Sequence, residues 1–265
     1  MHRTTANGVG RTDEETPLLG GFSSKRRQRT GLKSHLVDDL HFSWTDAILL
    51  ACYVVTGLLD SASIQVWGTF VSMQTGNTVY VGLGLASLAT TTPGSRLIKS
   101  AVSIAAFCLG SFVFGRFHHH FSPRRRWVLA ASFTIQALLT AAAAIIVGAD
   151  PPGGDDLAWN VLVPISLMAF QSCGQAVTSR VLRRDALISV VLTSAYCDLF
   201  SDSNLFKFDN VPRNQRALAP LLLLLGVVAG GLFAQSSIGI AGALWAGAGL
   251  KMCMVMAWLV WPSED

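Results

Sequence analysis

A carboxylate and a polar segment interrupt the first long apolar stretch of this chain, between residues 46 and 89. Asp60 lies inside the apolar run, and the polar segment from Ser72 to Asn77 follows it before apolar residues resume. An ionised carboxylate in hydrocarbon costs about 3 kcal/mol or more, so such a residue usually faces a protein partner or a cavity. A backbone break at membrane depth is tolerated only where protein or water surrounds it. We therefore predict a polar site inside a membrane domain.

These residues suggest two kinds of chemistry. Asp60 could carry a proton or a cation, or balance a cationic solute; the alternative is a structural acceptor that caps the break. Gln74, Thr75, Gly76 and Asn77 could begin a half-helix whose free N–H groups and positive dipole end bind an anion. The alternative is that they only satisfy the backbone of their own turn.

The second half of the chain contains a weaker version of the same pattern. Gln171 and Gln175 lie late in an apolar run, and Thr193 and Asp198 follow in the next segment. We align the segment that begins at Thr193 with the one that begins at Thr75, and Gln175 with the carboxylate. These residues complete the predicted site. Interhelical hydrogen bonding, worth roughly 0.5–2 kcal/mol for each glutamine, is the alternative.

The composition indicates a membrane protein. Of the 265 residues, 51% are hydrophobic and only 14% are charged, whereas soluble domains carry about 25% charged residues. The charges are concentrated in the N-terminal tail and in short connectors, so the net charge of +4 indicates topology rather than a nucleic-acid surface.

Several kinds of chemistry have no pattern in this sequence. There is no nucleotide-binding loop, GxSxG or HExxH motif, so we expect no enzyme and no cofactor. The run His118–His120 is expected in a solvated loop rather than around a metal. The five cysteines have no CxxC spacing, and we expect small core residues without a disulfide or metal site.

Charges in the connectors decide how many apolar runs cross the membrane. If all the runs crossed from a cytoplasmic tail, the most basic connector, residues 116–126, would lie outside, against the positive-inside rule. We therefore predict about six crossing helices plus two re-entrant or broken segments, at 69–89 and 186–202. The runs are residues 44–66, 69–89, 97–117, 127–148, 159–180, 186–202, 217–235 and 238–260.

Three crossings in each half invert the second half relative to the first, a plan common in secondary transporters. The predicted fold is an all-α polytopic membrane protein. It has one transmembrane domain, residues 41–262, built as an inverted repeat of residues 44–148 and 159–260.

The N-terminal tail carries two signals. Residues 1–40 are polar and predict a disordered tail, and the basic residues between Lys25 and Lys33 predict that it is cytoplasmic. Glu14, Leu18 and Leu19 resemble an acidic dileucine sorting signal, which would route the protein to a vacuolar or endosomal membrane; the plasma membrane is the alternative.

Two segments of the sequence resemble a known family. GLLDSA at residues 57–62, followed by FVSMQTGNT at 70–78, resembles the YoaK/DUF1275 family of integral membrane proteins. The second-half pattern at 170–175 and 191–199 is similar to the fungal branch of that family. The resemblance covers roughly residues 40–260 and implies about six transmembrane segments and no established activity. The residues Ser194-Ala195 depart from the family's Gly-containing turn, which affects the exactness of the repeat.

We predict a secondary transporter for a small polar solute, with an anion as one option. The alternative is a non-transporting scaffold or accessory subunit, and an intramembrane enzyme ranks last. The expected partners are the lipid bilayer and the solute, with no nucleic acid, and a homo-oligomer is left open.

The six-crossing topology has a direct test. A tag at residues 90–96 is expected outside and one at residues 118–124 in the cytoplasm, because the basic connector favours the cytoplasmic side. Labelling with a membrane-impermeant reagent, in intact and in permeabilised cells, checks both positions. The reverse result at both sites would contradict the topology.

Overall fold

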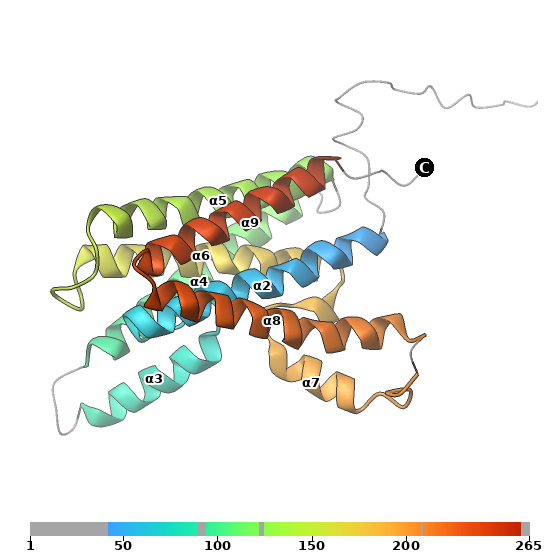
Figure 1. Ribbon diagram of the computed structural model, residues 1–265, viewed down its shortest axis with the longest axis horizontal. Helices are drawn as coiled ribbons and strands as arrows, with labels where there is room; N and C mark the ends of the chain where they lie inside the picture. The colour runs from blue at the N-terminus through green and yellow to red at the C-terminus, as the bar shows by residue number, and fades with distance from the viewer. Residues whose placement is uncertain (1–41, 89–93, 122–124, 208, 261–265) are drawn as a thin grey trace, which may run out of the picture. The chain divides into compact units, whose positions relative to one another are not determined.

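The computed structural model describes residues 42–88, 94–121, 125–207 and 209–260, and its helices are labelled in Figure 1. The predicted tail and the motif of Glu14, Leu18 and Leu19 lie outside the described residues. The helices are α2 (Phe42–Trp67), α3 (Gln74–Ser87), α4 (Ser95–Phe121), α5 (Arg126–Ala149), α6 (Trp159–Val181), the short 3-10 helix η1 (Asp185–Leu187), α7 (Leu192–Phe200), α8 (Val211–Gln235) and α9 (Gly239–Val260).

Six of these helices are long and apolar enough to cross a membrane, namely α2, α4, α5, α6, α8 and α9. Helices α3 and α7, with 14 and 9 residues, fall short of the roughly 20 residues that a crossing needs. Leu221, Leu225 and Leu232 on α8 are exposed and suit contact with lipid tails. The predicted all-α polytopic fold is therefore confirmed.

The first interrupted segment enters the bundle and leaves it on the same side. Gly68, just after α2, lies beside Arg96 in the first turn of α4, and its φ of 71° allows the chain to reverse. Ser103, two turns deeper along α4, donates to the carbonyl of Phe70 at 2.8 Å. Helix α3 then returns, and Gly84 contacts the first turn of α4. This is a re-entrant segment, as the connector charges predict.

The second interrupted segment does the same after α6. Ser179 donates to the carbonyl of Leu187 at 3.0 Å, and Gln175, one turn deeper, donates to the Ser189 hydroxyl at 2.8 Å. Helix α7 then returns along α8. In the view of Figure 1, α3 and α7 both lie below the long helices.

The helices pair in a way that is unchanged when the two halves are exchanged. Helix α2 packs along α8 as α6 packs along α4, and α3 lies on α4 as α7 lies on α8. Helices α5 and α9, which are counterparts, pack on each other and run antiparallel, because Gln136 meets Lys251 and Phe133 meets Trp258. This pairing is that of an inverted repeat.

The pairing also interlaces the halves into two bundles. The first, here called the α2 bundle, consists of α2, α8 and α9 with α7 on its surface. The second, the α6 bundle, consists of α4, α5 and α6 with α3 on its surface. The bundles meet along α5 and α9 and where α2 crosses α6.

Glycines allow the closest helix pairs to touch. Gly226 on α8 lies against the carbonyl of Val54 on α2, and Gly110 on α4 lies against the carbonyl of Phe170 on α6. The same spacing along the chain separates Gly110 from Gly226 and Val54 from Phe170, so the two contacts are counterparts. A side chain at either glycine would overlap the facing backbone.

Two expectations about side-chain environments are wrong. His118–His120 belong to the last turn of α4 rather than to a solvated loop, and His118 is fully buried because it faces Ser132 on α5. Only Cys52 and Cys173 are buried; the other three cysteines are exposed on their helices.

Substituting the crossing glycines tests the packing. Gly226→Ala and Gly110→Ala are each expected to lower stability by about 1–3 kcal/mol, because the added Cβ overlaps backbone. Gly249→Ala, with no atom near the new Cβ, is expected to be neutral or to raise stability by up to about 1 kcal/mol. Thermal unfolding of purified protein in detergent measures all three. Equal midpoints would contradict the tight crossings.

Candidate functional site

Asp60 holds the first interrupted segment in place from α2. Its Oδ1 accepts hydrogen bonds from the backbone N–H groups of Val71 and Ser72, each at 2.9 Å, and its Oδ2 accepts one from the Ser72 hydroxyl. These N–H groups precede α3 and have no helical partner. Asp60 therefore holds the segment before α3 in place from another helix.

Asn77 uses its whole side-chain amide to close the same segment. Its Oδ1 accepts from the Thr69 hydroxyl at 2.8 Å and from the Phe70 N–H at 3.0 Å. Its Nδ2 donates to the Phe70 carbonyl and to Gln74, both at 2.8 Å, and to Ser103 at 3.0 Å. We call these bonds, together with those of Asp60, the break network.

The break network includes several residues of the predicted first-half site. Asp60, Gln74 and Asn77 belong to it. Thr75 is exposed, and Gly76 lies so close to the ring of Phe70 that a Cβ would overlap it. The donors and acceptors of Asp60 and Asn77 are satisfied within the protein, so their bonds serve the fold first.

A second polar cluster lies where the two bundles meet. Gln175 on α6 donates through Nε2 to Thr56 on α2 at 2.5 Å and to Ser189 at 2.8 Å. Its Oε1 accepts from Lys251 on α9 at 3.2 Å. Lys251 also donates to Gln136 on α5 at 2.6 Å. We call Thr56, Gln136, Gln175, Ser189 and Lys251 the lysine cluster.

Lys251 is fully buried in the middle of a membrane-length helix. Its two hydrogen-bond acceptors are neutral amides, and it forms no ion pair among the described residues. A cationic side chain at this depth costs about 3 kcal/mol or more, so such a residue marks a functional site by default. The cluster continues weakly through Ser132, which lies 3.4 Å from Gln136 and 3.3 Å from His118.

Lys251 and Gln136 are not among the site residues that we predict from the sequence. The available signal was a single charged residue in the last apolar run, GIAGALWAGAGLKMCMVMAWLV, at residues 239–260. Such a lysine is easily read as interfacial, because its long side chain can reach a nearby membrane surface. Only the packing of α5, α6 and α9 shows that it points inward.

The remaining second-half candidates fall into two places. Gln171 is fully buried one turn before Gln175 on the same face of α6, and neither its Nε2 nor its Oε1 has a hydrogen-bond partner in the part of the chain that the structure describes. Thr193 and Asp198 are exposed on α7, away from the lysine cluster. The structure thus brings Gln171 and Gln175 together and leaves Thr193 and Asp198 apart.

Helix α6 connects the break network to the lysine cluster. Ser172, between the two glutamines, donates to the carbonyl of Val71 at 2.9 Å. The same helix therefore touches the segment that Asp60 holds and supplies Gln175 to Lys251. A movement of α6 would change contacts in both the break network and the lysine cluster.

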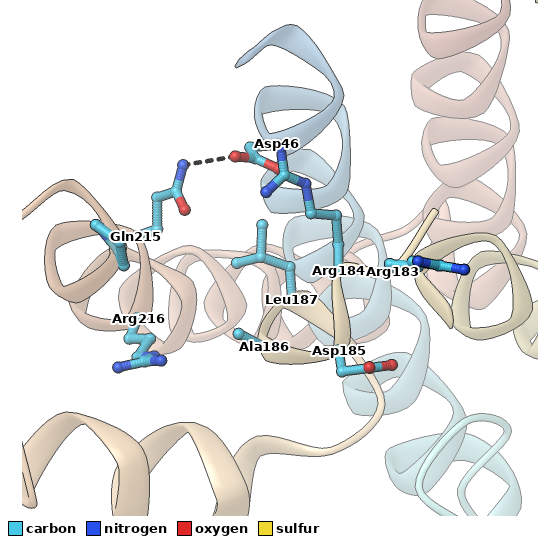
Figure 2. Close-up of a pocket in the computed structure, with 9 residues that line it drawn as sticks. Asp46, Arg183, Arg184, Asp185, Ala186, Leu187, Gln215 and Arg216 are labelled. Atoms are coloured by element: carbon cyan, nitrogen blue, oxygen red, sulfur yellow. Dashed lines mark hydrogen bonds and ion pairs between the residues drawn. The ribbon is translucent and has the colours of Figure 1, made fainter. Parts of the chain in front are cut away.

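A separate cavity of about 160 Å³ lies beside the start of α8 (Figure 2). Figure 2 shows Gln215 and Arg184 both directed at Asp46, at 2.9 Å in each case. Arg216 is 3.8 Å from Asp202, so the charges here are largely compensated. The cavity is lined by Asp46, Arg183, Arg184, Asp185, Ala186, Leu187, Pro212, Gln215 and Arg216.

A counterpart of this polar contact joins α4 to the segment before α6. Lys99 lies 3.4 Å from Asp156, and Ser95 donates to the same carboxylate at 2.7 Å. The Ser95 hydrogen bond and then the Lys99 charge lower the pKa of Asp156 below its ordinary value. Each bundle thus has a polar tie at the first turns of one long helix.

Comparison with known proteins gives the family. Residues 48–257 match the model of a family described as "Protein of unknown function (DUF1275)". The chain belongs to this family. No curated protein and no solved structure matches it. Within the described ranges no three His, Cys, Asp or Glu side chains form a group that could hold a metal ion.

Substitution of Asp60 tests whether it holds the segment before α3. Asp60→Ala leaves the N–H groups of Val71 and Ser72 buried without an acceptor and is expected to cost about 3 kcal/mol. Asp60→Asn keeps one acceptor oxygen and is expected to cost about 1 kcal/mol. Asp198→Ala, at an exposed carboxylate, is the control and is expected within about 0.5 kcal/mol of wild type. If Asp60→Ala unfolded at the wild-type temperature, this role of Asp60 would be wrong.

Proposed function

We propose that this membrane protein is a secondary carrier for a small polar solute. The observation that carries the proposal is the lysine cluster, a fully buried polar group with a cation at the meeting of two bundles. Secondary transporters commonly place their sites near the midplane between inverted repeats, beside interrupted helices. Both accompanying features, the inverted pairing and the re-entrant segments, are present in this fold.

The proposed motion is a rocking of the α2 bundle against the α6 bundle. Every hydrogen bond of Lys251, and the bond from Gln175 to Thr56, runs from one bundle to the other. Rocking would therefore open and remake the cluster without disturbing the glycine crossings, which lie inside each bundle. The contacts of Asp46 with Gln215 and of Asp156 with Lys99 also lie inside their own bundles and would be kept during the movement.

A non-transporting scaffold is the second candidate, and one observation favours it. Asp60 and Asn77, two of the predicted site residues, form their hydrogen bonds with other groups of the chain itself. In a scaffold the lysine cluster would likewise serve only to join helices.

Several further assignments belong to the proposal. We place the N-terminus in the cytoplasm and the protein in a vacuolar, endosomal or plasma membrane, and we assign it to the fungal branch of the family. We propose no catalytic activity and no cofactor.

Solute entry into proteoliposomes tests the carrier. Stopped-flow light scattering follows the re-swelling of vesicles after a jump in external urea, glycerol, potassium nitrate or potassium acetate, with valinomycin added for the salts. At least one solute is expected to enter faster than into protein-free vesicles, with a rate that saturates because binding precedes transfer. Folded protein that speeds none of these solutes, nor any of a wider metabolite panel, would favour the scaffold.

A further inference from the structure

The lysine cluster has more hydrogen-bond donors than acceptors. The Oε1 atoms of Gln136 and Gln175 both accept from Lys251. An ammonium has three N–H donors, and two of those on Lys251 are used within the described residues. The ring of Phe133 lies 5.9 Å from Nζ, which is at the outer limit of a cation–π contact.

Two glutamine side chains, on α5 and α6, carry further N–H donors. Gln136 uses its Nε2 only for a long contact of 3.4 Å to Ser132, although the group carries two hydrogens. Gln171 has both amide atoms buried without a partner, one turn from Gln175. A buried amide with neither group bonded calls for a partner that is not part of the chain, such as a water or an ion.

We propose that the lysine cluster, extended by Gln171, binds a small monovalent anion. A single uncompensated positive charge matches a single negative charge, and the unused amide and ammonium N–H groups match the acceptors of an anion. This inference names the solute class of the carrier proposed above and rests on that function. Lys251 supplies the charge, and Gln136 and Gln171 supply the donors.

The site selects for small size because it is closed. The exposed fraction is 0% for Lys251, Gln136 and Gln171. Gly174, between Gln171 and Gln175, has no side chain because a Cβ would overlap the amide of Gln136. An anion therefore reaches Lys251 only when the bundles separate, and one of the size of nitrate, chloride, formate or acetate needs the smallest separation.

Binding is tested on the purified full-length chain in uncharged detergent. The probes are the potassium salts of nitrate, chloride, formate and acetate, with sulfate as a dianion and gluconate as a large monoanion, at matched ionic strength. A ligand that binds the native state raises the unfolding temperature by mass action. At least one small monoanion is expected to do so in a saturating manner, and sulfate and gluconate are not.

Three variants locate the effect. Lys251→Met is expected to abolish the anion-dependent shift, and Gln171→Leu to weaken the apparent affinity by about tenfold, since a hydrogen bond to a charged group is lost. Lys99→Met is the matched control: it removes a second buried lysine, which already pairs with Asp156, and is expected to keep the wild-type shift. Each variant must show a cooperative transition in gluconate.

The outcomes separate the two proposals. A shift of equal size in wild type and Lys251→Met would overturn the anion site, as would a wild-type protein that no small monoanion stabilises. Saturable entry of urea or glycerol, unchanged in Lys251→Met, would overturn the anion site and leave the carrier standing. Anion binding that depends on Lys251, without faster entry of any solute into vesicles, would keep the site and refute the carrier.

Discussion

Hydrocarbon offers no hydrogen bonds, so every interruption of a membrane helix must be satisfied by the protein itself. In the first interrupted segment that requirement falls mainly on two side chains. Asp60 accepts the N–H groups that precede α3, and Asn77 closes the loop around Phe70. The re-entrant path, the position of α3 on α4 and the contact of α6 with Val71 all depend on these bonds. The N–H and O–H groups that donate to Asp60 explain why a carboxylate lies at this depth.

Lys251 presents the opposite situation. Its partners are two neutral amides from the opposite bundle, and they compensate a buried charge only in part. Replacing such a group with a hydrophobic residue often stabilises a protein, so stability alone does not explain its presence. The donors and acceptors of Asp60 and Asn77 are all bonded within the protein, whereas the lysine cluster has N–H groups that no described residue accepts. For this reason the proposed site lies at Lys251 rather than at Asp60.

Much of the architecture could be predicted from the sequence, because lipid imposes length, apolarity and charge rules on each segment. The six crossings and both re-entrant segments follow from run lengths and connector charges. The alignment of Gln175 with the region of Asp60 also agrees with the structure, because nearly the same number of residues separates the two glycine crossings. The direction in which a side chain points could not be predicted. Gln171 and Lys251 face inward, Thr193 and Asp198 are exposed, and His118 is buried, and each depends on helix rotations that apolar sequence leaves undetermined.

The interlaced bundles have a consequence for synthesis. Of the six long helices, α2 leaves the ribosome first, yet α8, on which it packs most extensively, is among the last. The carbonyl of Val54 and the polar atoms of Thr56 therefore enter the bilayer long before Gly226 and Gln175 arrive to cover them. Neither half has a complete core of its own, so the early helices must be sheltered at the insertion machinery until the chain is nearly finished. The order of translation thus opposes the order of packing, and assembly is a late event for the whole domain.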